Sequence, residues 1–344
     1  MGIPTENMET VAQALVAPGK GILAADESSG TIEKRFQAAG IESTEASRRA
    51  YRDLLFTTPG VEAFISGVIL FDETMRQSSD DGTSFPEFLA RRGIVPGIKV
   101  DRGAKPLAGA PGERITEGLD GLRERLGEYR ELGARFTKWR AVIGIGPDQP
   151  TDNAIRANAH ALARFAALSQ EAGLVPIVEP EVLRDGEHTV ERSFAATCRT
   201  LQAVFAELLA QGVWLDGMLL KPNMILAGYA CGEQQGPEQV AAWTIRALRR
   251  HVPAAVPGIV FLSGGQSDEI ATANLDALNR IGESEPWQLS FSFGRALQAA
   301  ALKTWAGDPA NVRAAQHLFA RRAEETGAAR GAASSPRPTS MPIG

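Results

Sequence analysis

At residues 217–224 the chain reads GMLLKPNM, a short apolar run that ends in a lysine and a proline. The apolar residues 218–220 indicate a buried strand, and Pro222 marks its end because proline cannot donate a ladder hydrogen bond. Lys221 is therefore expected at the tip of this strand, where burying an ammonium is costly unless it is paired or loses its proton. A neutral lysine is a nucleophile that forms Schiff bases with carbonyl compounds. The alternative for this stretch alone is a lysine with a buried stem whose ammonium reaches water.

Further short apolar segments lie on both sides of this strand, and helical patterns separate them. Most of the segments lack alternating polarity, which is typical of strands covered on both faces. Strands alternating with helices predict an α/β fold, here a (β/α)8 barrel with its active site at the carboxyl ends of the strands. The eight expected strands cover residues 21–25, 67–70, 97–101, 136–142, 175–182, 217–224, 258–265 and 288–297.

The expected helices include residues 44–56, 115–131, 152–171, 189–211, 237–250 and 267–280, and a last helix that begins near 309. Residues 72–84 are polar and are expected to form a loop. No linker interrupts the first 325 residues, so we expect a single domain over 1–325. Residues 326–344 are rich in Gly, Ala, Ser and Pro without periodicity, which predicts a flexible tail.

Composition argues against several classes of protein. The net charge of −5 gives no reason to expect nucleic acid or an anionic membrane as a partner. No apolar run reaches the ~20 residues that cross a bilayer, and the N-terminus does not read as a signal peptide. Cys198 and Cys231 form no CxxC motif, which fits a reducing cytosol, and the four histidines match no metal-binding motif. We therefore expect a cytoplasmic protein without a bound metal.

Charged side chains recur near one end of the predicted strands. Seven such residues belong to five strands: Asp26, Lys99, Lys138, Arg140, Glu179, Glu181 and Lys221. Burying them separately would cost many kcal/mol, so we expect them to converge in the mouth of the barrel. A second ammonium, that of Lys138, would there favour the neutral amine of Lys221, and the carboxylates would move protons. A structural ion-pair network inside the barrel is the alternative.

Two anion sites are predicted around this mouth. Ser263, Gly264 and Gly265 follow the seventh strand and Arg295 follows the eighth, each before a helix. Glycines let backbone N–H groups approach an anion, a helix N-terminus favours one, and an arginine adds a charge-assisted bond. The second candidate cluster lies across the mouth and comprises Lys99, Arg140 and Arg35 with the hydroxyls of Ser28 and Thr31. The alternatives there are a solvated helix charge for Arg35 and helix capping by Ser28 and Thr31.

Seven motifs, in this order, resemble those of the class I (Schiff-base) fructose-1,6-bisphosphate aldolases. They are GKGILAADES (19–28), GIKVD (97–101), FTKWR (136–140), VPIVEPE (175–181), LLKPNM (219–224), FLSGGQS (261–267) and FSFGRALQ (291–298). The resemblance covers roughly residues 10–320. It implies a (β/α)8 barrel and a glycolytic and gluconeogenic enzyme that cleaves fructose 1,6-bisphosphate reversibly into dihydroxyacetone phosphate and glyceraldehyde 3-phosphate. It also implies sugar phosphates as ligands, no metal, no cofactor beyond the covalent Schiff base, and a homotetramer.

The resemblance implies a role for each candidate residue. Lys221 resembles the Schiff-base lysine, Lys138 the lysine that assists carbinolamine chemistry, and Glu179 the proton-shuttling acid/base. Asp26 resembles the aspartate that orients the substrate and assists C3–C4 cleavage, and Glu181 a supporting carboxylate. The C1-phosphate site would comprise Ser263, Gly264, Gly265 and Arg295, while C6-phosphate and hydroxyl contacts would involve Lys99, Arg140, Ser28 and Thr31, with Arg35 as a mobile clamp.

The chain departs from the pattern of the animal enzymes in its last residues. Those enzymes end in a tyrosine that helps to exchange a proton at C3 of the enamine, whereas this chain ends in SSPRPTSMPIG (334–344). Phe293 and Thr31 also replace a tyrosine and a serine. A Schiff-base barrel for another sugar phosphate, such as a transaldolase or a seven-carbon bisphosphate aldolase, is the nearest alternative. More distant alternatives are a metal-dependent aldolase and a scaffold or binding protein that keeps the barrel fold without its activity.

Overall fold

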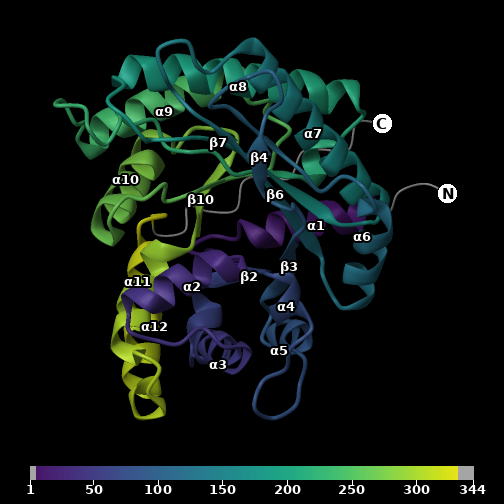
Figure 1. The fold of residues 1–344 in the computed structure, drawn as a ribbon, viewed down its shortest axis with the longest axis vertical. Helices are drawn as coiled ribbons and strands as arrows, with labels where there is room; N and C mark the ends of the chain where they lie inside the picture. The colour runs from purple at the N-terminus through teal and green to yellow at the C-terminus, as the bar shows by residue number, and fades with distance from the viewer. Residues whose placement is uncertain (1–4, 332–344) are drawn as a thin grey trace.

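The computed structural model describes residues 5–331 and shows a closed barrel of eight parallel strands. Their order around the barrel is β1, β2, β3, β6, β7, β8, β9 and β10, after which β10 pairs with β1. This confirms the predicted (β/α)8 barrel, and Figure 1 shows the helices surrounding it. The strands are β1 (Gly21–Ala25), β2 (Ile65–Leu70), β3 (Val95–Lys99), β6 (Phe136–Ile143), β7 (Val175–Val182), β8 (Leu219–Leu220), β9 (Gly258–Phe261) and β10 (Gln288–Phe293).

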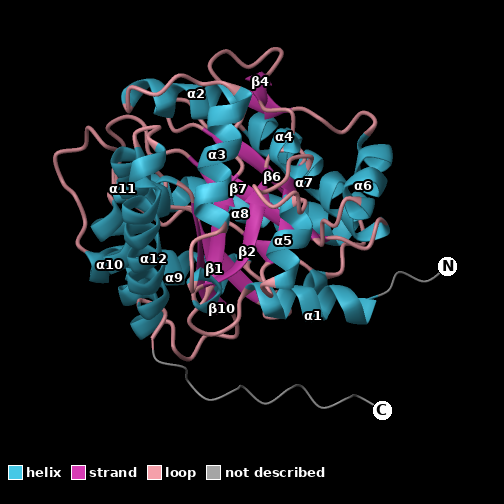
Figure 2. Cartoon of the chain, turned by 90° about the horizontal axis from the view of Figure 1, so that it is seen from below, coloured by secondary structure: helices cyan, strands magenta, loops and turns pink. Residues whose placement is uncertain are grey.

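The helices form a layer outside the strands, as the cyan and magenta elements of Figure 2 show. They are α1 (Thr5–Leu15), α2 (Ser29–Ala38), α3 (Glu45–Phe56), α4 (Asp72–Met75), α5 (Phe85–Arg91), α6 (Leu122–Glu131), α7 (Asp152–Glu171), α8 (Val190–Ala210), α9 (Pro237–His251), α10 (Asp268–Ile281), α11 (Arg295–Trp305) and α12 (Val312–Ala328). Short 3-10 turns cover Val61–Ala63, Leu215–Gly217 and Pro309–Asn311. None of the described helices has the length and apolarity that a membrane span requires.

The barrel strands are buried on both faces, which explains their missing alternation. Every residue of β2 and of β7 is buried. The amino end of the lumen is filled by Ile22, Phe136, Leu219 and their neighbours, and α1 closes this end with Met8 and other apolar residues. Apolar packing therefore occupies the amino end, and polar chemistry is left to the carboxyl end.

Helix starts follow local capping chemistry. Thr151 and Ser267 accept hydrogen bonds from the backbone N–H groups three residues later, which satisfies a free donor at the first turns of α7 and α10.

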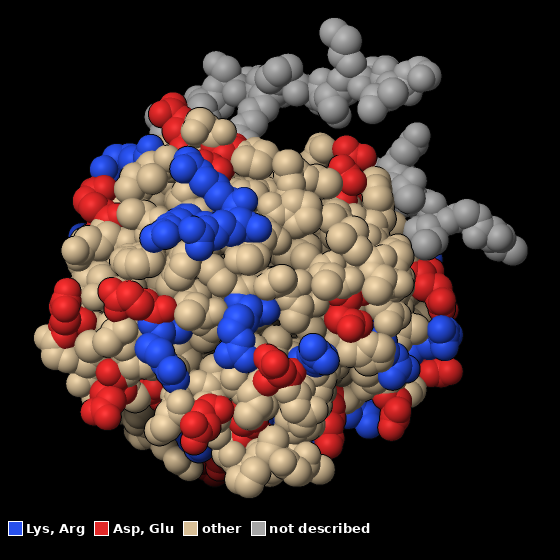
Figure 3. Space-filling view, turned by 90° about the horizontal axis from the view of Figure 1, so that it is seen from above, with Lys and Arg blue, Asp and Glu red and all other residues tan. Residues whose placement is uncertain are grey.

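On the outside of the barrel, the rings of Phe194 and Trp243 pack between α8 and α9 at a centroid distance of 5.1 Å. Arg246 lies over both rings. On the face of the molecule seen in Figure 3, basic and acidic residues are interspersed.

Several expected elements differ from the structure. The strands expected over 97–101, 258–265 and 288–297 cover Val95–Lys99, Gly258–Phe261 and Gln288–Phe293. The helix expected over 115–131 begins only at Leu122, because the left-handed backbone of Gly118 and Gly121 interrupts it. Before it, β4 (Ala104–Pro106) and β5 (Arg114–Thr116) form an antiparallel ribbon. The expected loop 72–84 contains α4, and the strand expected over 217–224 is reduced to Leu219–Leu220.

The C-terminal boundary is also different. Helix α12 continues to Ala328, past the expected boundary at 325, and both Thr326 and Arg330 are buried. The flexible tail expected over 326–344 therefore does not begin at residue 326. Residues 332–344 lie outside the described part of the chain.

Candidate active site

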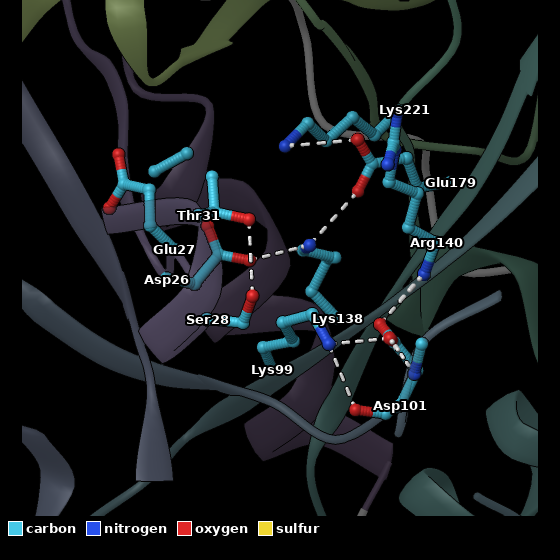
Figure 4. A network of polar contacts seen from close by, with 12 residues as sticks. Asp26, Glu27, Ser28, Thr31, Lys99, Asp101, Lys138, Arg140, Glu179 and Lys221 are labelled. Atoms are coloured by element: carbon cyan, nitrogen blue, oxygen red, sulfur yellow. Dashed lines mark hydrogen bonds and ion pairs between the residues drawn. The ribbon is translucent and has the colours of Figure 1, made fainter. Parts of the chain in front are cut away.

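Two lysines and two carboxylates meet at the carboxyl end of the barrel. Lys138 Nζ lies 2.5 Å from Asp26 Oδ2 and 3.3 Å from Glu179 Oε2, while Lys221 Nζ lies 3.3 Å from Glu179 Oε1. The four side chains come from β6, β7 and the residues directly after β1 and β8, and all are buried. Figure 4 shows Glu179 between the side-chain nitrogens of Lys138 and Lys221, so a single carboxylate contacts both lysines.

Parallel register places the charged residues of the strands on two neighbouring levels, two residues apart along β6. Lys99 pairs with Lys138 across β3 and β6, and Arg140 pairs with Glu179 across β6 and β7. Because β8 ends at Leu220, Lys221 leaves the ladder, although its N–H still bonds the carbonyl of Val178 at 2.8 Å. The end of the strand thus places the amine at the floor of the mouth.

The electrostatics of the Asp26–Lys138 pair follow from burial and proximity. Burial alone raises the pKa of Asp26, but the ammonium groups of Lys138 and Lys221 outweigh it and lower that pKa to about 2. Burial lowers the pKa of Lys138, but Asp26 and Glu179 outweigh it and hold that pKa above its usual range. Both members of the pair are therefore charged at neutral pH. Among the described residues, Glu179 Oε2 accepts no hydrogen bond.

A second cluster of charged side chains lies beside the two lysines and their carboxylates. Lys99 Nζ donates to the side chain and the carbonyl of Asp101, at 2.5 and 2.9 Å, and Arg140 Nε donates to Glu181. Asp101 Oδ2 also accepts from the backbone N–H of Arg140 at 3.2 Å. Glu181 thus faces Arg140. Burial lowers the pKa of Arg140, and the Glu181 carboxylate outweighs this and raises it.

The residues after β1 form the third side of the mouth. Glu27 binds the guanidinium groups of Arg35 and Arg52, so it neutralises basic neighbours. Ser28 occupies the N-cap position of α2, but its side chain makes no capping bond, and its hydroxyl lies 3.1 Å from that of Thr31. The capping alternative for Ser28 is therefore wrong.

A cavity of about 880 Å³ joins these groups. The predicted site residues that line it are Asp26, Ser28, Thr31, Arg35, Lys99, Lys138, Arg140, Glu179 and Lys221. Glu181 lines a small neighbouring pocket instead. The cavity can hold a polar, phosphate-bearing molecule against the two lysines.

The glycine loop lies at another edge of the mouth, outside the lining of the cavity. Gly264 and Gly265, which follow Ser263, have φ values of 54° and 78°, in the left-handed region that favours glycine. A Cβ placed on Gly265 would lie 3.3 Å from Arg295 Nη2, so the arginine at the start of α11 lies beside this loop. The structure thus brings Gly265 and Arg295 together.

Comparisons with known proteins match nearly the whole chain. Residues 7–338 match the family model of class I fructose-bisphosphate aldolase. A probable class 1 fructose-bisphosphate aldolase of Xanthomonas campestris pv. campestris is 57% identical over 325 residues, which cover 94% of this chain and 97% of that protein. Cytosolic fructose-bisphosphate aldolase 6 of Arabidopsis thaliana is 56% identical, with coverage of 88% and 84%.

A solved structure agrees with the sequence relatives. Fructose-bisphosphate aldolase of Plasmodium falciparum, in complex with TRAP and a small-molecule inhibitor, superposes with a TM-score of 0.93 at 49% identity, covering 95% of this chain and 94% of that one. The chain belongs to the class I fructose-bisphosphate aldolase family. It is a metal-independent lyase of that family. Among the described residues, no group of three or more His, Cys, Asp and Glu side chains is arranged to hold a metal ion.

Sequence reasoning did not assign a role to two residues at the mouth of this aldolase barrel. Asp101 holds Lys99, and its signal was present in the sequence, because it ends the charged strand motif GIKVD. Tyr229 contacts the glycine loop from the segment that follows β8. No periodicity or motif marks Tyr229, because its partner is 35 residues away along the chain.

Proposed function

We propose that this chain cleaves fructose 1,6-bisphosphate reversibly into dihydroxyacetone phosphate and glyceraldehyde 3-phosphate through a Schiff base on Lys221. The observation that carries the proposal is the amine of Lys221, buried at the floor of a polar cavity and 3.3 Å from Glu179. A carboxylate at this distance can accept the proton of the amine and return a proton to the substrate oxygen.

The steps follow from the groups in place. Lys221 Nζ attacks the C2 carbonyl, and the carbinolamine loses water as Glu179 and Lys138 supply and remove protons. The protonated imine is an electron sink. The C4 hydroxyl loses its proton with assistance from Asp26, the C3–C4 bond breaks, and its electron pair enters the imine to form an enamine as the aldehyde leaves. A proton then adds at C3, and water releases the ketone product and free Lys221.

The enamine needs a donor for the proton that adds at C3. Glu179, which contacts Lys221, or a water molecule delivers this proton. The position of Glu179, with one carboxylate oxygen 3.3 Å from Lys221 Nζ and the other 3.3 Å from Lys138 Nζ, supports the first route.

The phosphates occupy opposite edges of the mouth. We assign the C1 phosphate to Ser263, Gly264, Gly265 and Arg295, and the C6 phosphate and hydroxyl contacts to Lys99, Arg140, Ser28 and Thr31, with Arg35 as a mobile clamp. Glu181 supports the site by holding Arg140. Two separated anion contacts align the scissile bond with remote binding energy. We further propose a cytoplasmic homotetramer that acts in glycolysis and gluconeogenesis and uses no cofactor beyond its own imine.

Borohydride reduction tests the nucleophile. In the presence of dihydroxyacetone phosphate we expect wild-type protein to gain one covalent adduct, located on Lys221 by mass spectrometry, and Lys221→Met to gain none. The matched control is Lys303→Met, which removes an exposed lysine on α11 and should leave labelling unchanged. Labelling of Lys221→Met at the wild-type level would show that another amine is the nucleophile.

A further inference from the structure

The segment between β8 and α9 sends one side chain onto the glycine loop. Tyr229 is 50% exposed, yet its hydroxyl donates a 2.6 Å hydrogen bond to the carbonyl oxygen of Gly264. A Cβ placed on Gly265 would lie 1.9 Å from the same hydroxyl oxygen, so the hydroxyl also packs against the Cα of Gly265. One tyrosine therefore contacts both glycines of the candidate phosphate loop.

Contacts with Arg184 hold the ring of Tyr229 in place. The guanidinium of Arg184, which follows β7, lies 4.5 Å from the ring centroid and donates to the carbonyl of Ala227 at 2.9 Å. The backbone N–H of Tyr229 donates to the carbonyl of Arg184 at 3.0 Å. Gly228 permits this close approach, because a Cβ there would lie 2.2 Å from the carbonyl oxygen of Gly186. The loops after β7 and β8 thus act as one support for the ring.

The hydrogen bond on the carbonyl of Gly264 also orients an N–H group. The peptide unit is planar and trans, so the N–H of Gly265 points opposite to the Gly264 carbonyl and away from Tyr229. Within the described residues, neither the Gly264 nor the Gly265 N–H donates to another protein group. Gly264 and Gly265 are the central residues of a turn that the Gln266 N–H closes on the carbonyl of Ser263 at 3.0 Å. Because left-handed glycines permit more than one orientation of the peptide between them, the bond from Tyr229 selects one.

We propose that Tyr229 is a positioning residue for the phosphate of the ketone substrate. Its hydroxyl holds the Gly264–Gly265 peptide so that the Gly265 N–H, beside Arg295, faces the phosphate. Tyr229 itself does not touch the substrate. The inference rests on the proposed function and extends it to a residue outside the cavity lining.

Two ketones that differ only in the phosphate test the inference. Dihydroxyacetone phosphate and dihydroxyacetone can both form an imine with Lys221, and borohydride traps each adduct. In Tyr229→Phe, which keeps the ring under Arg184, we expect the half-saturating concentration of dihydroxyacetone phosphate to rise about three- to tenfold, the range for one lost hydrogen bond. Neither the maximal trapping rate nor the half-saturation by dihydroxyacetone should change.

The controls separate positioning from general damage. Trp243→Phe alters another aromatic ring that lies under an arginine, on α9, and should leave both ketones unaffected. Arg184→Met keeps the tyrosine hydroxyl but removes its support, and should weaken dihydroxyacetone phosphate binding in the same direction. Thermal unfolding of each variant verifies that the protein is folded.

The outcomes distinguish this inference from the function on which it rests. If Arg295→Ala weakens dihydroxyacetone phosphate but Tyr229→Phe does not, the role of Tyr229 is overturned and the proposed function stands. Equal losses for the two ketones in Tyr229→Phe would also overturn it, because the effect would not concern the phosphate. If wild-type protein forms no adduct on Lys221, the proposed function falls and this inference falls with it.

Discussion

At the scale of single residues, the charge balance of the site depends on Lys138. The sequence predicts a second ammonium, that of Lys138, beside Lys221 with carboxylates close by, and the structure places carboxylates in contact with both lysines. Lys138 is paired with Asp26, and Glu179 contacts both lysines. Burial of such a pair is tolerated because each charge has a partner, and removing either member would leave the other uncompensated.

The Asp26–Lys138 pair predicts a dependence of stability on pH. The pKa of Asp26 is lowered from 3.8 to about 2 by folding, so its contribution is complete well above 3.8 and is lost as the pH falls towards 2. Between pH 5 and pH 3 we expect this group alone to account for a loss of about 1 kcal/mol in the free energy of unfolding. The pKa of Lys138 is raised, so its contribution is present below its ordinary pKa and is lost only as the pH rises through the folded value.

Urea unfolding at several pH values measures this effect. Asp26→Asn should be less stable than wild type at pH 7 and should lose less stability between pH 5 and pH 3. The exposed Asp80→Asn is the control and should keep the wild-type slope. Identical slopes for wild type and Asp26→Asn would contradict the ion-pair account.

At the scale of elements, an arginine just after α12 joins the last strand of the barrel to the segment that leads into the first strand. Arg330 donates to the carbonyls of Leu289 and Val16 at 3.1 Å, and also to those of Ala17 and Lys20. These carbonyls belong to β10 and to the segment before β1. Strands β1 and β10 share only two register pairs, so this arginine reinforces the seam that closes the barrel.

Replacement of Arg330 tests the seam. Arg330 is only 9% exposed, and this burial lowers the pKa of its guanidinium to about 10. Arg330→Met should lower the free energy of unfolding by at least about 2 kcal/mol, because several buried carbonyls lose their donor. Arg321→Met, on the exposed face of the same helix, should have no measurable effect in the same urea titration. A loss no larger than that of the control would show that the seam is held by strand pairing alone.

At the scale of the whole molecule, barrel closure assembles the site. The site residues belong to segments spread from Asp26 to Arg295, and the closed order of eight strands brings their carboxyl ends to one mouth. Packing at the amino end and chemistry at the carboxyl end are separate regions of one lumen. This separation lets polar groups gather without disturbing the apolar core.

The proposed homotetramer predicts the molecular mass of the protein in solution. Sedimentation equilibrium at micromolar concentrations should give four times the mass of one chain. The proposed site residues all belong to one chain, so we expect dilution that dissociates the tetramer to leave the trapping of dihydroxyacetone phosphate on Lys221 intact. A species that remains monomeric at all concentrations would contradict the proposal.

The sequence by itself determined the architecture and the charged residues of the strands. Apolar segments alternating with helices suffice for the barrel, because both depend on local hydrophobic patterns. The limits of helix 152–171 were also predictable, since Thr151 caps it locally. Lys221 could be singled out because a lysine at the end of an apolar strand requires an explanation.

Only the tertiary structure decided which groups touch. It showed that Glu179 contacts both lysines, that Glu181 faces Arg140, and that Tyr229 supports the glycine loop. It also reduced the Lys221 strand to Leu219–Leu220 and extended α12 beyond residue 325. The physical reason is that these outcomes depend on contacts between segments far apart in the chain. The distances between such segments follow from barrel closure and strand register, whereas the local sequence pattern indicates only which residues are buried and where an element starts.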